Sequence, residues 1–237
     1  MGAASGCSRT RHTVSTLPRP APGTLQEALP LFPLSTVLFP DGTVSLQIFE
    51  VRYLDLIGKC YKNGTPFGVV SLTQGHEVRT VDASNPAGDG FATETFADVG
   101  TLAHIVDFAA PQAGLMVIGC TGSTRFRIHA RRQLKHGLWV ADVEYLADDL
   151  PETIPADLQP VTHALARLIE QQRDEQSPLE FPLLAPPYRL DECGWVANRW
   201  CDLLSLPPPI KQNLLQLDSP LLRLELVGDL LTGVSAF

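Results

Sequence analysis

The stretch LPLFPLSTVLFPDGTVSLQIFE, residues 29–50, decides the fold because it places three prolines inside the first long apolar run of the chain. Proline fixes φ and has no backbone N–H, so it suits strand starts, sheet edges and turns but not the middle of a central strand. We therefore expect a short edge strand at residues 31–34, a turn at residues 40–42 and a second strand at residues 43–49. Such a sharply bent entry is typical of a small barrel rather than of an open parallel sheet.

The remainder of the first half alternates extended runs with one helix. Residues 50–61 carry apolar side chains at helical spacing, and the Asn63-Gly64 pair predicts the end of that helix. Residues 74–90 are polar and glycine-rich, which predicts a long loop. Further strands are expected at residues 66–72, 96–108, 115–128 and 138–145. About six strands, mostly antiparallel, favour a closed or half-closed barrel over residues 29–147.

The second half of the chain, residues 148–237, has the periodicity of helices. Apolar stripes predict helices at residues 158–169, 196–204, 210–217 and 221–231. Ser219 followed by Pro220 is typical of an N-cap and a first-turn proline, here for the last helix. The acidic, proline-bearing residues 148–151 suit a solvated linker between the two halves. Three or four amphipathic helices with short connections form a small bundle.

Composition and motifs argue against several classes of protein. The formal net charge is −8, and such a field repels a phosphate backbone, which disfavours nucleic acid as a partner. The chain contains no GxxxxGK[ST], HExxH or GxSxG motif, and its six histidines are scattered. We therefore expect no catalytic residue, no cofactor and no metal ion. An enzyme whose catalytic groups lie far apart in the sequence stays open, because such groups are recognised by geometry.

The cysteines and the apolar runs indicate the cellular compartment of the protein. The five cysteines form no CxxC pair and no zinc-ligand spacing, so we interpret them as reduced, mostly buried thiols. No apolar run reaches the ~20 residues that a membrane helix requires. These features predict a cytoplasmic protein that does not contact a membrane.

Residues 1–28 are rich in proline, serine and threonine and lack apolar periodicity, which predicts a disordered tail. Two alternatives stay open. The composition, with arginines and no acid before Glu27, is mildly similar to that of a transit peptide, and the gene start can instead have been placed too early. Under each interpretation we expect the tail to add nothing to the core.

Four motifs occur in an order that is fairly specific, although each alone is weak. They are LPLFPLSTVLFPDGTVSLQIFEVRYLDLI at residues 29–57, FADVGTLAHI at 96–105, LMVIGCTGSTRFRI at 115–128 and LPPPIKQNLLQLDSPLLRLELVGDLL at 206–231. In this order they resemble the N-terminal domain of Lon proteases, and the chain is similar to the stand-alone proteins of that family. The resemblance implies an α+β fold, a PUA-like antiparallel β pseudo-barrel followed by a small C-terminal helical bundle. One departure is Asp41, which stands where the family usually has glycine.

The resemblance also implies a non-enzymatic module that binds unfolded or extended polypeptide, with a protease or another protein as a further partner. Aromatic and apolar side chains dominate such contacts. The peptide-binding candidates flank the proline-rich loop or lie where the bundle faces the barrel: Phe32, Leu38, Phe39, Tyr188 and Trp195. Each of them can instead belong to the core, and for Phe32 the core is the simpler interpretation.

RNA binding is the alternative, because PUA-like barrels often bind RNA. Its support in the sequence is one basic cluster, and the candidate residues are Arg125, Arg127, Arg131 and Arg132. A solvated strand edge explains the same cluster. Salt separates the two functions, because binding to phosphates weakens steeply with ionic strength whereas apolar peptide binding does not.

Overall fold

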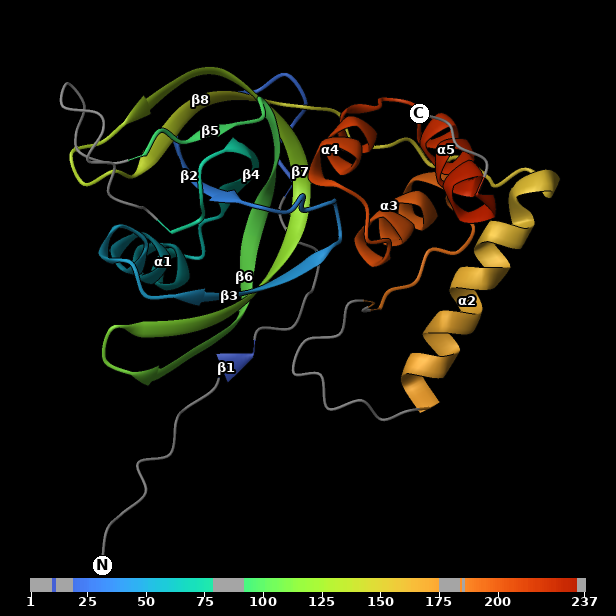
Figure 1. Ribbon diagram of the computed structural model, residues 1–237, viewed down its shortest axis with the longest axis horizontal. Coiled ribbons are helices and arrows are strands. Elements are labelled where there is room, and N and C mark those ends of the chain that lie inside the picture. The colour runs from blue at the N-terminus through green and yellow to red at the C-terminus, as the bar shows by residue number, and fades with distance from the viewer. Residues whose placement is uncertain (1–9, 12–18, 79–91, 175–183, 185, 234–237) are drawn as a thin grey trace, which may run out of the picture.

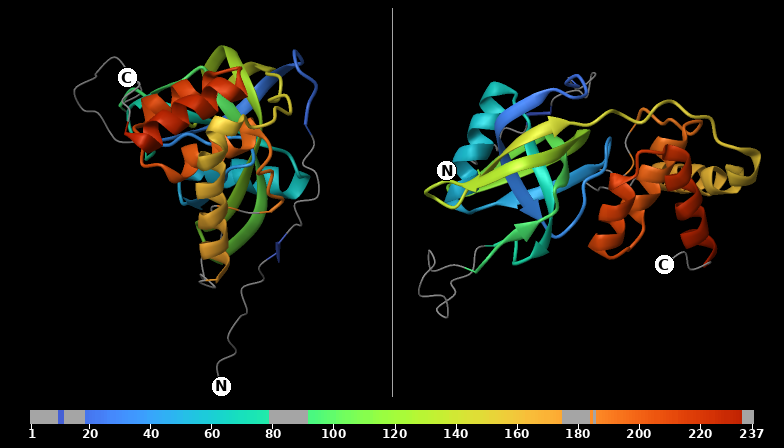
Figure 2. Two further views of the ribbon diagram at one scale, coloured as in Figure 1. Left: turned by 90° about the vertical axis from the view of Figure 1, so that its right-hand side faces the viewer. Right: turned by 90° about the horizontal axis from the view of Figure 1, so that it is seen from above.

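The computed structural model describes residues 10–11, 19–78, 92–174, 184 and 186–233. A strand-rich half and a helical half lie side by side, and the chain crosses between them once after the last strand (Figures 1 and 2). This arrangement confirms the expected α+β class with a barrel followed by helices.

The part of the chain that the structure describes has eight strands, five of which close the pseudo-barrel. The strands are β1 (Thr10–Arg11), β2 (Leu25–Leu34), β3 (Thr43–Ile48), β4 (Phe67–Gln74), β5 (Thr95–Phe96), β6 (Val99–Gln112), β7 (Leu115–Gln133) and β8 (Trp139–Tyr145). Their order is β1-β6-β4-β2-β8-β7-β3, and an additional pairing of β6 with β7 joins the two sides into a ring. Every pairing is antiparallel except that of β2 with β4, which is parallel.

The prolines of β2 lie at the ends of its ladders. β2 is longer than expected and pairs with both β8 and β4, so as a whole it is not an edge strand, although residues 32–34 pair with β4 alone. Pro30 lies opposite Val140 of β8, just before the ladder with β4 begins at Leu31. Pro33 lies opposite Val70 of β4, beyond the point where the ladder with β8 ends. Each proline therefore occurs where β2 is paired on one side only, and a missing N–H is tolerated there.

Helix α1 (Val51–Asn63) covers one side of the barrel, as the apolar spacing predicts (Figure 1). Its buried side chains include Tyr53, Ile57 and Cys60, which pack with strand residues in one core cluster. Gly64 ends the helix with φ of 65°, a left-handed conformation that glycine adopts without a steric penalty.

The helical half contains a short 3-10 turn, η1 (Ala156–Leu158), and four α-helices: α2 (Gln159–Asp174), α3 (Cys193–Leu203), α4 (Pro208–Gln216) and α5 (Pro220–Thr232). The expected cap is present, because the Ser219 hydroxyl accepts a hydrogen bond of 3.2 Å from the Leu222 N–H. Helix α3 is buried along most of its length and forms the centre of this half. No helix among the described residues is long and apolar enough to span a membrane.

Two segments expected to be loosely attached are packed instead. β2 begins at Leu25, and Gly23 donates a backbone hydrogen bond to Tyr145, so the prediction of disorder is wrong for residues 19–28. Residues 1–9 and 12–18 lie outside the described part of the chain. In the linker, the Asp149 side chain is only 16% exposed and forms ion pairs with both halves, so it is not a solvated linker residue.

The cysteines that the structure describes, Cys60, Cys120, Cys193 and Cys201, are free and buried. Burial raises their pKa values, that of Cys201 to about 12, so these thiols stay protonated and unreactive at neutral pH. Cys7 lies outside the described residues.

Candidate functional site

The proline-rich loop fastens the barrel to the helices. Val37 and Phe39 leave the barrel and pack within the core cluster of the helical half, where Phe39 is fully buried. Phe32 and Leu38 are buried in the barrel core instead, with Phe32 stacked on Tyr53 at 4.0 Å between ring centroids. The expectation that Leu38 and Phe39 are exposed for peptide contact is therefore wrong, because the barrel core buries Leu38 and the helical core buries Phe39.

The turn that follows is held by backbone hydrogen bonds. Asp41 has φ of 59°, the left-handed conformation that explains why glycine is usual at this position. The Arg199 guanidinium of α3 donates to the carbonyls of Pro40 and Asp41. On the barrel side, a Cβ on Gly122 would lie 2.3 Å from the Phe39 carbonyl oxygen, so only glycine allows β7 to approach the turn this closely.

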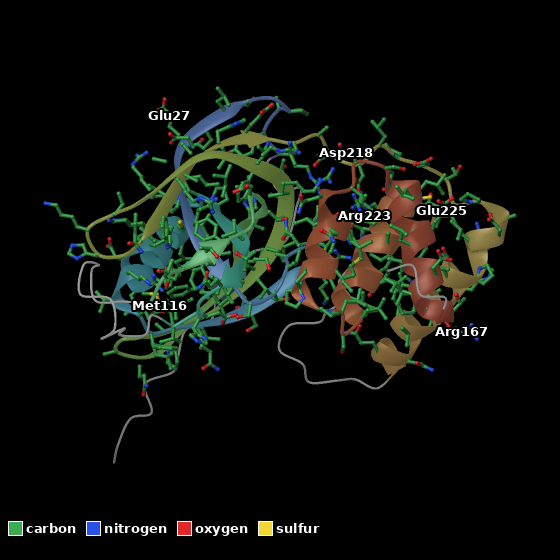
Figure 3. All side chains as sticks on the ribbon, turned by 45° about the horizontal axis from the view of Figure 1, so that its top comes forward. Glu27, Met116, Arg167, Asp218, Arg223 and Glu225 are labelled. Carbon is green, nitrogen blue, oxygen red and sulfur yellow. The ribbon has the colours of Figure 1, made fainter. Side chains whose placement is uncertain are left out.

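A buried charge network forms the second connection between the halves. Arg125 of β7 donates to the carbonyls of Leu215 and Leu217, and Arg223 of α5 also donates to Leu217. Asp149 is the carboxylate shared by both arginines, whose side chains are 4% and 1% exposed. Figure 3 shows Arg223 near the junction of the two halves. The Arg125 guanidinium is therefore occupied by partners within the protein, which argues against the predicted RNA contact.

A cavity of ≈ 590 Å³ lies between the halves next to this network. Its wall combines the Pro40 turn, β7, the linker and the start of α3, and Pro186, Pro187, Trp195 and Asn198 form its helical side. Trp195 is 4% exposed, and Tyr188 meets its ring edge-on at 6.2 Å. The structure thus brings together Tyr188, Trp195 and Arg125, which the sequence analysis assigned to two different functions.

Opposite charges meet along the lining of this cleft. Asp41 forms ion pairs with Arg19 and Arg189, and Arg19 also reaches Asp148 at 2.9 Å. The sequence analysis missed Arg19, Asp41 and Asp148 as site residues. The one signal in the sequence was Asp41 in place of the usual glycine. A side chain at a position with a strained backbone suggests that the side chain has a partner.

Asp202 lies behind the turn, where burial raises its pKa to about 6, although Arg199 at 3.0 Å and Lys211 oppose the rise and Asp41 adds to it. An unfolded aspartate has a pKa of about 3.9. Between about pH 4 and pH 6 the native state therefore holds a proton that the unfolded state has lost.

We therefore expect Asp202→Asn to remove a pH dependence. The contribution of Asp202 to the free energy of unfolding is largest below about pH 4 and falls as the pH rises through about 6. Between pH 5 and pH 7.5 the wild-type protein should lose about 1.4 kcal/mol relative to Asp202→Asn. Chemical denaturation of both proteins at the two pH values measures this change. If the free energies of unfolding of the two proteins differ by the same amount at both pH values, the raised pKa of Asp202 is contradicted.

Exposed apolar side chains of functional interest occur on three segments that meet at Arg52, near the start of α1. The buried Arg52 guanidinium joins three segments there through Glu50, the Glu77 carbonyl and the Gly137 carbonyl. Each segment carries exposed apolar side chains, with exposed fractions of 54% for Phe49, 81% for Val51, 46% for Val78 and 44% for Leu134. We call these four side chains the barrel-end surface.

The sequence contains a signal for the barrel-end surface at the start of α1. The buried stripe of α1 includes Tyr53, Ile57 and Cys60. Val51 precedes Tyr53 by two positions, about 200° around the helix, so it lies off the apolar stripe. An apolar residue off the stripe at a helix start is exposed by default.

The remaining members of the basic cluster lie on the outer part of β7 and face carboxylates. Arg131 pairs with Asp98 at 2.8 Å, and Arg132 lies 3.6 Å from Asp142. Arg127 is exposed and stands opposite Glu144 in the strand register. The positive charge of this edge is therefore largely balanced. Within the described ranges, no three His, Cys, Asp or Glu side chains are arranged to hold a metal ion.

A pseudo-barrel carrying one helix and followed by a helical bundle defines a class of α+β domain, and comparison with known proteins identifies it. Residues 28–233 match the substrate-binding domain of ATP-dependent protease La (LON). The chain therefore belongs to the family of Lon substrate-binding domains.

Solved structures agree with this assignment. The crystal structure of a Lon N-terminal domain protein from Xanthomonas campestris is 29% identical, with a TM-score of 0.63 over 88% of this chain and 99% of that chain. The N-terminal domain of Mycobacterium avium complex Lon protease is 14% identical, with a TM-score of 0.53 over 86% of this chain and 97% of that chain. At the lower identity the similarity concerns the fold alone.

Proposed function

We propose that this substrate-binding module is a non-enzymatic cytoplasmic adaptor that holds unfolded or extended polypeptides and presents them to a separate protease. Membership of the Lon substrate-binding family supports the substrate class. The barrel-end surface is the observation that carries the proposal. Aromatic and branched apolar side chains left in water are the groups that an unfolded polypeptide can cover.

The barrel-end surface suits weak and general binding. Phe49 and Val51 lie outside the core clusters, so they are free to contact a partner without disturbing the fold. Arg52 is 7% exposed, and its hydrogen bonds to Glu50, Glu77 and Gly137 hold the three segments in fixed positions. A fixed apolar surface avoids part of the ordering cost of binding, whereas the flexible partner still loses entropy. We therefore expect modest affinity with little sequence preference.

RNA binding is the weaker candidate. Arg125 is committed to the buried network, and Arg131 and Arg132 have carboxylate partners. A phosphate backbone would have to compete with Asp98 and with Asp142 on the same strand edge. The overall charge of −8 adds repulsion at longer range.

Replacing Phe49 and Val51 together by serine should weaken the binding of a reduced, carboxymethylated and thus permanently unfolded polypeptide by about 1–2 kcal/mol. The side chains are exposed, so the melting temperature should change little. Fluorescence anisotropy with the labelled polypeptide measures the affinity.

Leu222→Ser is the matched control, because Leu222 is 43% exposed on α5, in the other half. It should leave binding unchanged. Equal losses of affinity in the control and in the double variant would show that the barrel-end surface is not the binding site. If binding is lost in moderate salt and in Arg132→Glu but is unchanged when Phe49 is replaced, recognition of phosphates, as in RNA binding, is favoured instead.

A further inference from the structure

The side chain of Arg19 bridges two carboxylates that line the cleft between the two halves. One of its terminal nitrogens, Nη2, lies 2.9 Å from Asp41 Oδ1, and the other, Nη1, lies 2.9 Å from Asp148 Oδ1. Asp41 belongs to the turn between β2 and β3, whereas Asp148 lies in the linker after β8. Two carboxylates from separate segments thus hold one guanidinium supplied by a third segment.

Arg19 differs from the arginines that build the junction. The side chains of Arg125, Arg199 and Arg223 are 1–4% exposed, and each donates to backbone carbonyls. The Arg19 side chain is 34% exposed, and its acceptors are the carboxylates of Asp41 and Asp148. Partly exposed ion pairs contribute little to stability. The guanidinium of Arg19 can therefore leave at small cost.

The cleft beyond Arg19 has the chemistry of a cation site with an apolar wall. Apart from Arg19, its lining contains two arginines, Arg125 and Arg189, against four carboxylates: Asp41, Asp148, Asp149 and Glu192. Trp195, Pro186 and Pro187 complete the wall. Arg223 also pairs with Asp149, so with Arg19 displaced one negative charge stays uncompensated beside the apolar side chains.

We propose that this cleft is a binding site for an arginine side chain of an extended polypeptide, and that Arg19 occupies it when no polypeptide is bound. An incoming guanidinium makes the same two charge-assisted contacts with Asp41 and Asp148, and the flanking residues of the polypeptide lie along the proline and tryptophan wall. The N-terminal segment thereby competes with the ligand. The proposal rests on the proposed function only for the polypeptide nature of that ligand.

The test uses two short peptides, acetyl-Gly-Gly-Arg-Gly-Gly-amide and the same peptide with citrulline, which has nearly the shape of arginine but no charge. Arg19→Gln should bind the arginine peptide about fivefold more tightly than the wild-type protein, the factor that a partly exposed ion pair is worth. The citrulline peptide should bind neither protein measurably. Adding Asp148→Asn to Arg19→Gln should abolish the gain. Equal binding of the two peptides, or no gain in Arg19→Gln, would overturn the proposal.

His104, a buried residue of β6, provides a second readout, because burial lowers its pKa and the charge of Arg19 lowers it further. In an NMR titration the pKa of His104 should rise in Arg19→Gln and fall again with the arginine peptide, but not with citrulline. A pKa that is the same in both proteins would show that Arg19 is absent from the cleft in solution.

The two proposals fail separately. Serine at Phe49 and Val51 should leave binding of the arginine peptide unchanged, because these side chains lie on the barrel-end surface and do not line the cleft. Loss of unfolded-polypeptide binding with the arginine peptide still bound would affect only the proposed function. Intact polypeptide binding without discrimination between arginine and citrulline would affect only the cleft.

Discussion

Asp149→Ala is expected to lower the free energy of unfolding by about 3–5 kcal/mol, the usual cost of leaving a buried charge without its partner. The loss is large because Asp149 serves two buried guanidiniums at once, Arg125 from the barrel and Arg223 from α5. Among the described residues, Arg223 would stay buried with no carboxylate partner, and Arg125 would keep only the exposed Asp218 at 3.9 Å. Urea denaturation followed by tryptophan fluorescence measures the loss, since Trp195 and Trp200 lie in the helical core.

Asp218→Ala is the control for this prediction. Asp218 also approaches Arg125, at 3.9 Å, but its side chain is 89% exposed. Removing it should cost less than about 1 kcal/mol, as for other exposed ion pairs. A similar small loss in both variants would mean that the shared carboxylate does not hold the halves together.

Phe39→Ala should have a comparable effect, a loss of about 3–5 kcal/mol, because truncating a buried phenylalanine removes its apolar contacts and leaves a cavity. The cavity would open where the barrel loop enters the helical core, beside residues such as Trp195. Affinity of the folded variant for unfolded polypeptide should not change, since Phe39 is fully buried. Calorimetric melting measures the change in stability. Fluorescence anisotropy, carried out below the melting temperature of the variant, measures the affinity of the folded protein.

Phe49→Ala gives the opposite pattern and is the natural comparison. Phe49 is 54% exposed, so its truncation should barely affect stability and should weaken polypeptide binding. If Phe39→Ala instead weakened binding with full stability retained, the loop would be a contact surface and its burial in the helical half would be incorrect.

The elements that local sequence determines were predictable. The apolar spacing of α1, the Gly64 that ends it and the Ser219 N-cap each depend on residues within one or two turns of each other. Such local preferences act regardless of what the rest of the chain does. The α+β class followed from them, because strands and helices are segregated along the sequence.

The site was less predictable because its residues meet only after folding. Phe39 looks like an exposed loop residue until the helices, more than a hundred positions later, cover it. Arg125 and Arg131 lie six positions apart on one strand, yet Arg125 is buried at the junction and Arg131 is on the outer edge. Asp149 has the same sequence neighbourhood as a solvated linker residue. Nothing local distinguishes these alternatives.

Hydrogen exchange of the full chain, with and without a saturating reduced and carboxymethylated polypeptide, locates the polypeptide on the structure. We expect added protection in the three segments that meet at Arg52, residues 49–52, 77–78 and 134–138, with none on α5. Protection confined to the helical half, or no protection at saturation, would contradict polypeptide binding at the barrel-end surface.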